Sequence, residues 1–325
     1  MARSAGDNRS IAFTKMHGLG NDYVYINCFE ERLEGVDIPA LARAMSDRHR
    51  GIGSDGIILI QPPDGDGETR PSNEGARAES LKRTWRAPAA RMEMYNADGS
   101  RGEMCGNGIR CVAKYLLDHG LIEQRGADPV ELCVQTDRGP LALWAWREEG
   151  VVTRVRVSME APHLRPAEIP VALSGDRCVA VDLPGLEGRY HMTSVSMGNP
   201  HAVVFVDSLD EFDLAERDPL FPNRVNLHVA SVRSRGEASM RSWERGSGLT
   251  LACGTGACAV LVAGVLEDRL DRAAMIHLPG GDLEIEWPEA GGEEVAPVFM
   301  TGPAVEVFDG RWPVTRSEFR VTRNE

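Results

Sequence analysis

Two stretches of the chain place apolar residues at helical spacing and begin with the same cysteine and glycine pattern. The first, Met104 to Leu117, reads MCGNGIRCVAKYLL, and its apolar side chains recur every three or four residues from Ile109 onward. The second, Leu251 to Leu266, reads LACGTGACAVLVAGVL. This pattern predicts a helix in each stretch, starting near Gly106 in the first, with the leading cysteine as the residue that caps its N-terminus.

Elsewhere, short apolar runs bounded by Gly, Pro, Asn and Asp predict β-strands. One short amphipathic helix is predicted over 38–45. The predicted strands span 11–16, 23–28, 57–60, 92–95, 131–136, 141–146, 151–159, 194–206 with a central Gly-Asn turn, 283–287 and 298–307.

The second half of the chain repeats the order of the first. In each half a strand, a turn that contains Asn and a second strand precede the cysteine helix, as KMHGLGNDYVYI over 15–26 and SVSMGNPHAVVFV over 194–206. Such an ordered repeat indicates an internal duplication. We therefore predict an α+β fold with two similar domains, each a mostly antiparallel sheet wrapped around a central helix, and an active site in the cleft between them.

The predicted domain boundaries follow from the same repeat. Residues 1–10 are expected to form a disordered leader, and 11–149 together with about 303–325 the N-terminal domain. Residues 150–302 are expected to form the C-terminal domain. The segment 61–90 is rich in Pro, Gly, Ser and charged residues, which is typical of a surface insert.

Composition narrows the class of partner. The net charge is −13, aromatic residues make up 6% of the chain, and basic residues form no run, so nucleic acids and anionic membranes are poor partners. The first ten residues lack the apolar core of a signal peptide, and the longest apolar run, 257–266, is too short to span a bilayer. We expect a soluble, cytoplasmic protein whose seven cysteines are reduced thiols.

The two leading cysteines, Cys105 and Cys253, are predicted to be reactive. The first N–H groups of a helix lack internal partners, and the helix dipole places partial positive charge there, which favours a thiolate and attracts a carboxylate. The backbone N–H groups predicted to hold a substrate carboxylate belong to Gly106, Asn107, Gly254 and Thr255.

Two equivalent thiols suit the inversion of an α-carbon. Removing the α-proton of an amino acid from one face and returning a proton to the other requires a base and an acid of similar pKa. Because the thiols and helix ends supply base, acid and charge stabilisation, we predict a small-molecule substrate and catalysis with no cofactor and no metal.

Other uses of these residues are weaker. Cys253 and Cys258 have the loose spacing of zinc ligands, but the sequence lacks the rest of a closed site. No His stands at motif spacing from a carboxylate, and no phosphate-binding glycine motif occurs. The remaining cysteines are expected to be structural, and they are Cys28, Cys111, Cys133, Cys178 and Cys258.

Between about Phe13 and Asp309 the chain carries, in order, MHGLGND, RHxGIGxDG, NADGSxxxMCGNGIRC, MGNPH, RVN, ERGxG, LACGTGACA and LPGG. This series resembles the diaminopimelate epimerases, pyridoxal-phosphate-independent enzymes that interconvert LL- and meso-diaminopimelate on the route to lysine and peptidoglycan. The resemblance implies diaminopimelate as the small-molecule substrate, no cofactor, and a homodimer.

The resemblance also implies roles for individual residues. Cys105 would be the proton donor and Cys253 the proton acceptor, and Arg245 would fix the distal carboxylate of the substrate. The residues implied to bind substrate are Asn21, Asn96, Gly106, Asn107, Asn199, Asn226, Glu244, Arg245, Gly254 and Thr255.

Three features depart from the family pattern. Gly56 stands where Gln is common, Leu249 stands where Glu is common, and the insert at 61–90 is longer than usual. Two alternatives therefore stay open. One is a related two-cysteine racemase for proline, hydroxyproline or histidine. The other is a non-catalytic protein that binds an amino acid, although binding alone requires neither thiol.

Overall fold

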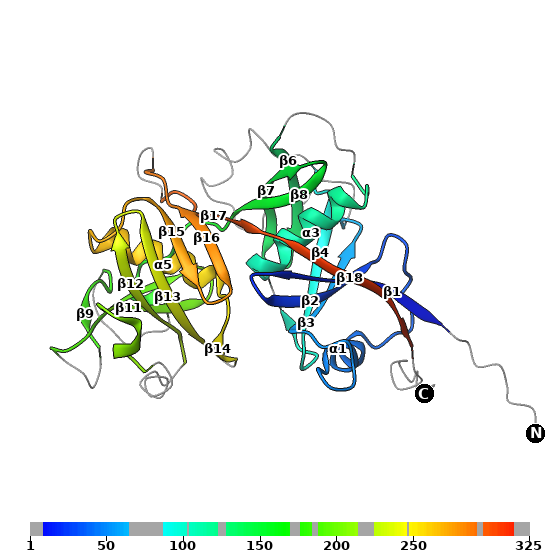
Figure 1. Ribbon diagram of the computed structural model, residues 1–325, viewed down its shortest axis with the longest axis horizontal. Coiled ribbons are helices and arrows are strands. Elements are labelled where there is room, and N and C mark those ends of the chain that lie inside the picture. Colours follow the sequence, from blue (N-terminus) through cyan, green and yellow to red (C-terminus); the bar gives the residue numbers. More distant parts are fainter. Residues whose placement is uncertain are drawn as a thin grey trace, which may run out of the picture. The chain divides into compact units, whose positions relative to one another are not determined.

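The computed structural model describes residues 9–64, 87–102, 104–122, 128–169, 176–183, 188–213, 224–245, 247–290 and 295–314 (Figure 1). The chain divides into two compact units. Unit 1 comprises the chain up to Val155 and again from Pro303, and unit 2 runs from Arg156 to Gly302. Most of the predicted leader and insert, residues 1–8 and 65–86, lies outside the described residues.

In its described residues, unit 1 combines strands with the helices α1 (Ile38–Ser46) and α3 (Gly106–Asp118). Neighbouring strands pair in antiparallel fashion except for β2 with β3 and β4 with β6, which are parallel. The strands are β1 (Ser10–Gly18), β2 (Asn21–Asn27), β3 (Gly56–Gln61), β4 (Ala90–Asn96), β5 (Arg101–Gly102), β6 (Val130–Thr136), β7 (Gly139–Glu148) and β18 (Val305–Pro313). Strands β8 (Val151–Ser158) and β17 (Phe299–Pro303) contain the two boundaries between the units.

Unit 2 contains helix α5 (Gly254–Leu266) and short 3-10 turns, η1 (Pro166–Glu168) and η2 (Leu209–Glu211). Its parallel pairs are β11 with β12 and β13 with β15. The strands are β9 (Val181–Asp182), β10 (His191–Ser196), β11 (Pro200–Phe205), β12 (Asn226–Ser234), β13 (Glu237–Glu244), β14 (Gly248–Thr250), β15 (Ala273–Leu278) and β16 (Gly281–Glu286).

The same sequence of strand pairings occurs in both units. From β1 to β7, skipping β5, successive pairs are antiparallel, parallel, antiparallel, parallel and antiparallel. From β10 to β16, skipping β14, the pairs have the same order. The register therefore matches individual positions. Ile58 pairs with Met94 in unit 1, and the corresponding pair in unit 2 is His228 with Ser242.

Each unit has a buried helix at its centre. Every residue of α3 from Gly106 to Leu117 is buried, and α5 is buried from Gly256 to Gly264. Because these helices have no wide solvent face, sheet strands must cover most of their surface. Helix α3 contacts β1, β2, β6 and β7, and α5 contacts β10 to β13, β15 and β16.

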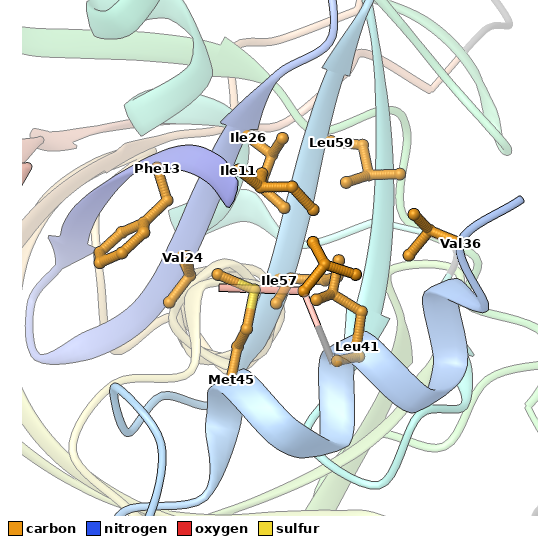
Figure 2. Packing of buried hydrophobic residues seen from close by; sticks show 11 residues of the cluster. Ile11, Phe13, Val24, Ile26, Val36, Leu41, Met45, Ile57 and Leu59 are labelled. Atoms are coloured by element: carbon orange, nitrogen blue, oxygen red, sulfur yellow. The ribbon is translucent and has the colours of Figure 1, made fainter. Parts of the chain in front are cut away.

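The strand residues of β3 alternate between two layers. Ile57 and Leu59 join a core cluster with Leu41 and Met45 of α1, as Figure 2 shows, whereas Ile58 lies beside Gly108 in the first turn of α3. A continuous apolar run such as GIILI therefore fits a strand with helices against both faces. Burial of these side chains supplies the main favourable free energy of folding.

The predicted α+β fold is confirmed, as is the predicted start of the first helix at Gly106. In the described part of the chain, no helix has both the length and the apolar character needed to cross a membrane.

Candidate active site

Cys105 caps the N-terminus of α3, with an extended backbone at φ −131°. Its Sγ accepts a hydrogen bond from the N–H of Gly108 at 3.4 Å and donates to Oδ1 of Asn21 at 3.3 Å. The same Asn21 oxygen accepts from Nδ2 of Asn107 at 3.3 Å. The amide Nδ2 of Asn21 donates to Asp55 at 2.8 Å, which fixes its orientation. The hairpin tip and the helix end thus meet at this sulfur.

A charged network fixes the hairpin that carries Asn21. Arg48 donates to Asp22 at 2.7 Å and to Asp55 at 2.8 Å, and Lys15 also binds Asp22. Burial would raise the pKa of Asp22, but its hydrogen bonds and attraction to Arg48 and Lys15 outweigh this and lower it. The ionised carboxylate therefore ties the RHRGIGSDG loop to the hairpin.

A buried cation lies in the first turns of α3. Arg110 is 0% exposed and donates to Gly106 O at 3.2 Å, Asn107 Oδ1 at 3.0 Å and Pro303 O at 3.2 Å. A Cβ at Gly18 would lie 2.9 Å from the Arg110 guanidinium, so the glycine of MHGLGND makes room for it. The side chain of Asn107 is thus held from both sides, by Arg110 and by Asn21.

Asn96 and Gly56 lie opposite each other at the ends of β4 and β3. The amide of Asn96 donates to Ser100 at 3.0 Å within its own turn. A Cβ at Gly56 would lie 2.1 Å from the carbonyl oxygen of Tyr95. This close approach of the backbone explains why a larger residue does not fit at 56 in this chain.

Tyr23 is a neighbour of the first thiol that sequence reasoning missed. Its pKa is raised well above the ordinary value, first by burial and then by the charge of Cys105 and a hydrogen bond with it. Tyr23 belongs to a strand that is continuously buried from Tyr23 to Asn27, and such an apolar run carries no signal for a role beside a thiol.

Cys253 caps α5 and is 4% exposed. Burial raises the pKa of its thiol well above the ordinary value, and the Glu244 carboxylate raises it further by charge and by hydrogen bonding. Thr255 and the N–H of Gly256 act in the opposite direction. The sequence predicts that the helix end favours a thiolate, and the N–H of Gly256 acts in that direction, but burial and Glu244 act more strongly and favour the protonated thiol of Cys253.

The remaining predicted residues of unit 2 gather around the same helix end. Asn226 accepts from the N–H of Arg245 at 2.9 Å and donates to the carbonyl of Pro200 at 3.0 Å, which ties the start of β11 to the end of β13. Glu244 accepts from Thr250 at 2.5 Å. The side chain of Leu249, at the position that departs from the family pattern, is 65% exposed on β14.

Two buried histidines, His201 and His228, lie behind Cys253, and the sequence alone assigned them no role. The nitrogen atoms of His201 and His228 and the sulfur of Cys253 lie within 4.8 Å of one another, the only such metal-capable group among the described residues. However, His201 Nδ1 and His228 Nε2 are 2.8 Å apart and share a hydrogen bond. A zinc ion bonded at about 2.0 Å to both nitrogens in tetrahedral geometry would hold them farther apart. This spacing is that of a hydrogen-bonded pair.

The chain is similar to known proteins over most of its length. The family model described as "Diaminopimelate epimerase" matches residues 13–163 and 193–307. A diaminopimelate epimerase of Agathobacter rectalis is 48% identical over 92% of this chain and 98% of its own length. One from Desulfovibrio desulfuricans is 46% identical over 93% of this chain and 98% of its own length.

Solved structures share the fold at much lower identity. A hydroxyproline epimerase from Agrobacterium vitis is 14% identical, with a TM-score of 0.63 over 98% of this chain and 97% of its own. A phenazine biosynthesis protein of the PhzF family from Bacillus anthracis is 15% identical, with a TM-score of 0.64 over 94% of this chain and all of its own. The sequence matches go beyond fold, because they cover nearly the whole chain at more than 40% identity. The chain belongs to the diaminopimelate epimerase family.

Proposed function

We propose that this protein interconverts LL-2,6-diaminopimelate and meso-diaminopimelate by proton transfer at the α-carbon, with Cys105 and Cys253 as the acid/base pair. The observation that carries the proposal is the repeated placement of a thiol at the N-cap of the central helix in both units. Relatives with this activity in their names match nearly the whole chain. A two-base reaction needs one sulfur on each face of the carbon, and a duplicated scaffold supplies two equivalent thiols.

In one direction Cys253 accepts the α-proton and Cys105 donates, and in the other direction the roles are exchanged. Before Cys253 can accept a proton it must lose its own. Glu244 is hydrogen-bonded to this thiol and is a base of suitable position to take that proton. The thiol of Cys105 donates a hydrogen bond to the amide oxygen of Asn21. Because this oxygen is neutral and does not remove the proton, the thiol can still give it to the substrate.

The negative charge that builds on the substrate as the proton leaves requires nearby donors. The first backbone N–H groups of each central helix supply them, and the α-carboxylate would accept from Gly106 and Asn107 or from Gly254 and Thr255. Because these donors are held by the helix, they need little reorganisation in the transition state. This arrangement replaces the electron sink that a cofactor would otherwise supply.

Recognition of the distal end depends on charge. Arg245 is exposed at the end of β13, beside the backbone that Asn226 holds, and its guanidinium suits a carboxylate as a two-pronged partner. The remaining substrate contacts that we propose come from the side chains of Asn21, Asn96, Asn199, Asn226 and Glu244.

The test is isotope exchange. The purified protein is incubated with LL-diaminopimelate in deuterated buffer, and solvent deuterium at the α-carbon is followed by mass spectrometry beside proline and histidine. We expect label in diaminopimelate together with formation of the meso isomer, and none in the two controls. Label in proline or histidine instead would assign the chain to a related racemase. The Cys105→Ala variant is the matched control for background exchange.

Cytoplasmic location and a homodimer stay predictions of the sequence and of the family resemblance.

A further inference from the structure

A chain of hydrogen bonds runs through the buried interior of unit 2 toward Cys253. Oγ of Ser242 lies 2.9 Å from Nδ1 of His228. Nε2 of His228 lies 2.8 Å from Nδ1 of His201, whose Nε2 lies 2.9 Å from Oδ1 of Asn199. Ser242 and both histidines are buried, so water does not compete for these bonds.

The chain continues from Asn199 to the sulfur. Nδ2 of Asn199 donates to Oγ1 of Thr255 at 3.4 Å, and this hydroxyl lies 3.7 Å from Sγ of Cys253. Thr255 is the second residue of α5, two positions after the N-cap residue Cys253. The polar interior of the unit is thus connected to the thiol through one amide and one hydroxyl.

With the amide of Asn199 oriented as it is in the structure, the donors and acceptors have one consistent direction. The amide oxygen of Asn199 only accepts, so Nε2 of His201 carries a proton. Burial lowers the pKa of both histidines, to about 3 for His228, so both rings are neutral and each has one bare nitrogen. His201 Nδ1 is therefore an acceptor that needs the Nε2–H of His228, and the bare Nδ1 of His228 needs the hydroxyl proton of Ser242.

The direction of these hydrogen bonds decides whether the hydroxyl of Thr255 can donate to the sulfur of Cys253. Because Asn199 donates its N–H to Oγ1, Thr255 keeps its own hydroxyl proton for the sulfur of Cys253. If the amide were turned over, its oxygen would take that proton and Thr255 could only accept from the thiol. A donated hydrogen bond favours the thiolate, and here it opposes the effect of Glu244.

Unit 1 shows that the fold does not require this series of hydrogen bonds. The positions of His228 and Ser242 are occupied there by Ile58 and Met94, which pair in the same way. In unit 1 a Cβ at Gly108 would lie 2.6 Å from Ile58, and in unit 2 a Cβ at Gly256 would lie 2.4 Å from the imidazole of His228. The polar pair therefore occupies a place that an apolar pair fills equally well.

We propose that His228 and Ser242 are positioning residues for Cys253. They hold His201 as the Nε2–H tautomer, His201 holds the amide of Asn199, and Asn199 leaves the Thr255 hydroxyl free to donate to the sulfur. The proposal deepens the function proposed above, on which it rests for the role of Cys253. It predicts a thiol that ionises more readily than burial beside a carboxylate would otherwise allow.

The first test reads the tautomers directly and needs no substrate. Nitrogen-15 NMR of the full-length protein labelled at histidine should show His201 and His228 neutral, each protonated at Nε2, between pH 6 and 8. Single replacements of each histidine by Gln assign the signals. A proton on Nδ1 of either residue would mean that the chain runs the other way, and the proposal would be wrong.

The second test compares two replacements of one residue. His228→Phe keeps a flat ring against Gly256 but cannot donate, whereas His228→Gln keeps an N–H donor for His201. Alkylation of Cys253 by iodoacetamide, followed on its own peptide by mass spectrometry, reports how much thiolate is present. We expect the rate at pH 7.5 to fall about tenfold in His228→Phe, which corresponds to a rise of about one unit in the thiol pKa, and His228→Gln to recover most of it.

Ile58→Leu, at the matching position of unit 1, is the control and should leave alkylation of Cys253 unchanged. Circular dichroism and denaturant unfolding establish that each variant is folded. Equal losses in the folded His228→Phe and His228→Gln variants would show that the ring only fills space, which overturns the proposal. Failure of isotope exchange in diaminopimelate would instead remove the proposed function and leave the tautomer and alkylation results standing.

Discussion

The two units place a cysteine at the same point of the same fold but surround it with different chemistry. In unit 1, the half-buried Cys105 bonds to the amide of Asn21, and the buried cation Arg110 lies in the first turns of the helix. In unit 2, Cys253 is buried beside the carboxylate of Glu244 and a neutral pair of histidines. The position that Arg110 occupies in α3 is taken by Cys258 in α5.

The difference shows which features of the site come from the duplicated fold and which come from side chains that differ between the units. The repeated backbone supplies equivalent positions, helix ends and backbone donors, whereas local side chains set the charge beside each sulfur. The two-base reaction that we propose needs one protonated and one deprotonated thiol in each direction, so two identical environments would not distinguish them. Glu244 and burial favour the protonated state of Cys253 in the free protein.

Removing either sulfur tests whether the two sites are equivalent in function. We expect Cys105→Ala and Cys253→Ala each to lower the rate of epimerisation by about 10³-fold or more, because a positioned acid or base contributes roughly 10²–10⁴-fold. Turnover of LL-diaminopimelate measures the effect. The controls are Cys111→Ala and Cys258→Ala, which remove thiols buried within the helices and should alter stability more than rate. Activity retained in either Cys105→Ala or Cys253→Ala would show that the two thiols are not equivalent in function.

Replacing one glycine in the first turn of each central helix by alanine tests how rigidly the side chain that faces this glycine is held. Gly256→Ala would press against the His228 ring, which is held at both nitrogens, so we expect a loss of about 1–3 kcal/mol in the free energy of unfolding. Gly108→Ala would meet the flexible end of Ile58, which can rotate away, and should cost less than about 1 kcal/mol. Urea unfolding of both variants measures the difference, and equal losses would contradict it.

Acid should destabilise unit 2 through its histidines. An unfolded histidine has a pKa of about 6.5, whereas burial lowers the pKa of His201 well below this and that of His228 to about 3. Below about pH 6.5 the unfolded chain binds protons that the folded unit does not, so stability present above this pH falls as the solution is acidified. The slope should reach about 1.4 kcal/mol per pH unit for each histidine.

The matched variant for this prediction is His228→Phe, which removes one of the two titrating groups. Its unfolding free energy between pH 7.5 and 5 should fall less steeply than that of the parent protein. An identical pH dependence in the two proteins would show that His228 already binds a proton in the folded unit.

Strands β13 and β4 occupy matching positions in the two units. In unit 2 the residue after β13 is the cation Arg245, whereas in unit 1 the residue after β4 is Ala97. We expect Arg245→Lys to raise the KM for diaminopimelate by about tenfold, or about 1.4 kcal/mol, because a two-pronged guanidinium becomes a point charge. Ala97→Ser is the control at the matching position and should leave KM unchanged. A KM unaffected by Arg245→Lys would indicate that another group holds the distal carboxylate.

The sequence alone was sufficient where the signal is local. The start of α3 at Gly106 and its cap at Cys105 follow from a few neighbouring residues, and so do the strands predicted at 131–136 and 141–146, which are β6 and β7 in the structure. The repeat of turn and helix patterns in the two halves was enough to predict two similar sheets, each around a central helix. These features depend on backbone geometry and apolar spacing, which neighbouring residues encode.

Tertiary structure alone decided the surroundings of each thiol. His201 and His228 meet because β11 and β12 are parallel neighbours with a particular register, and nothing near either residue in the sequence specifies that pairing. The position of Arg110 in unit 1 and the raised pKa of Cys253 likewise depend on which distant residues are packed nearby. Charge and burial act through space, whereas the pattern that predicts a helix acts along the chain, so the N-cap positions of the two cysteines were readable from the sequence and their protonation was not.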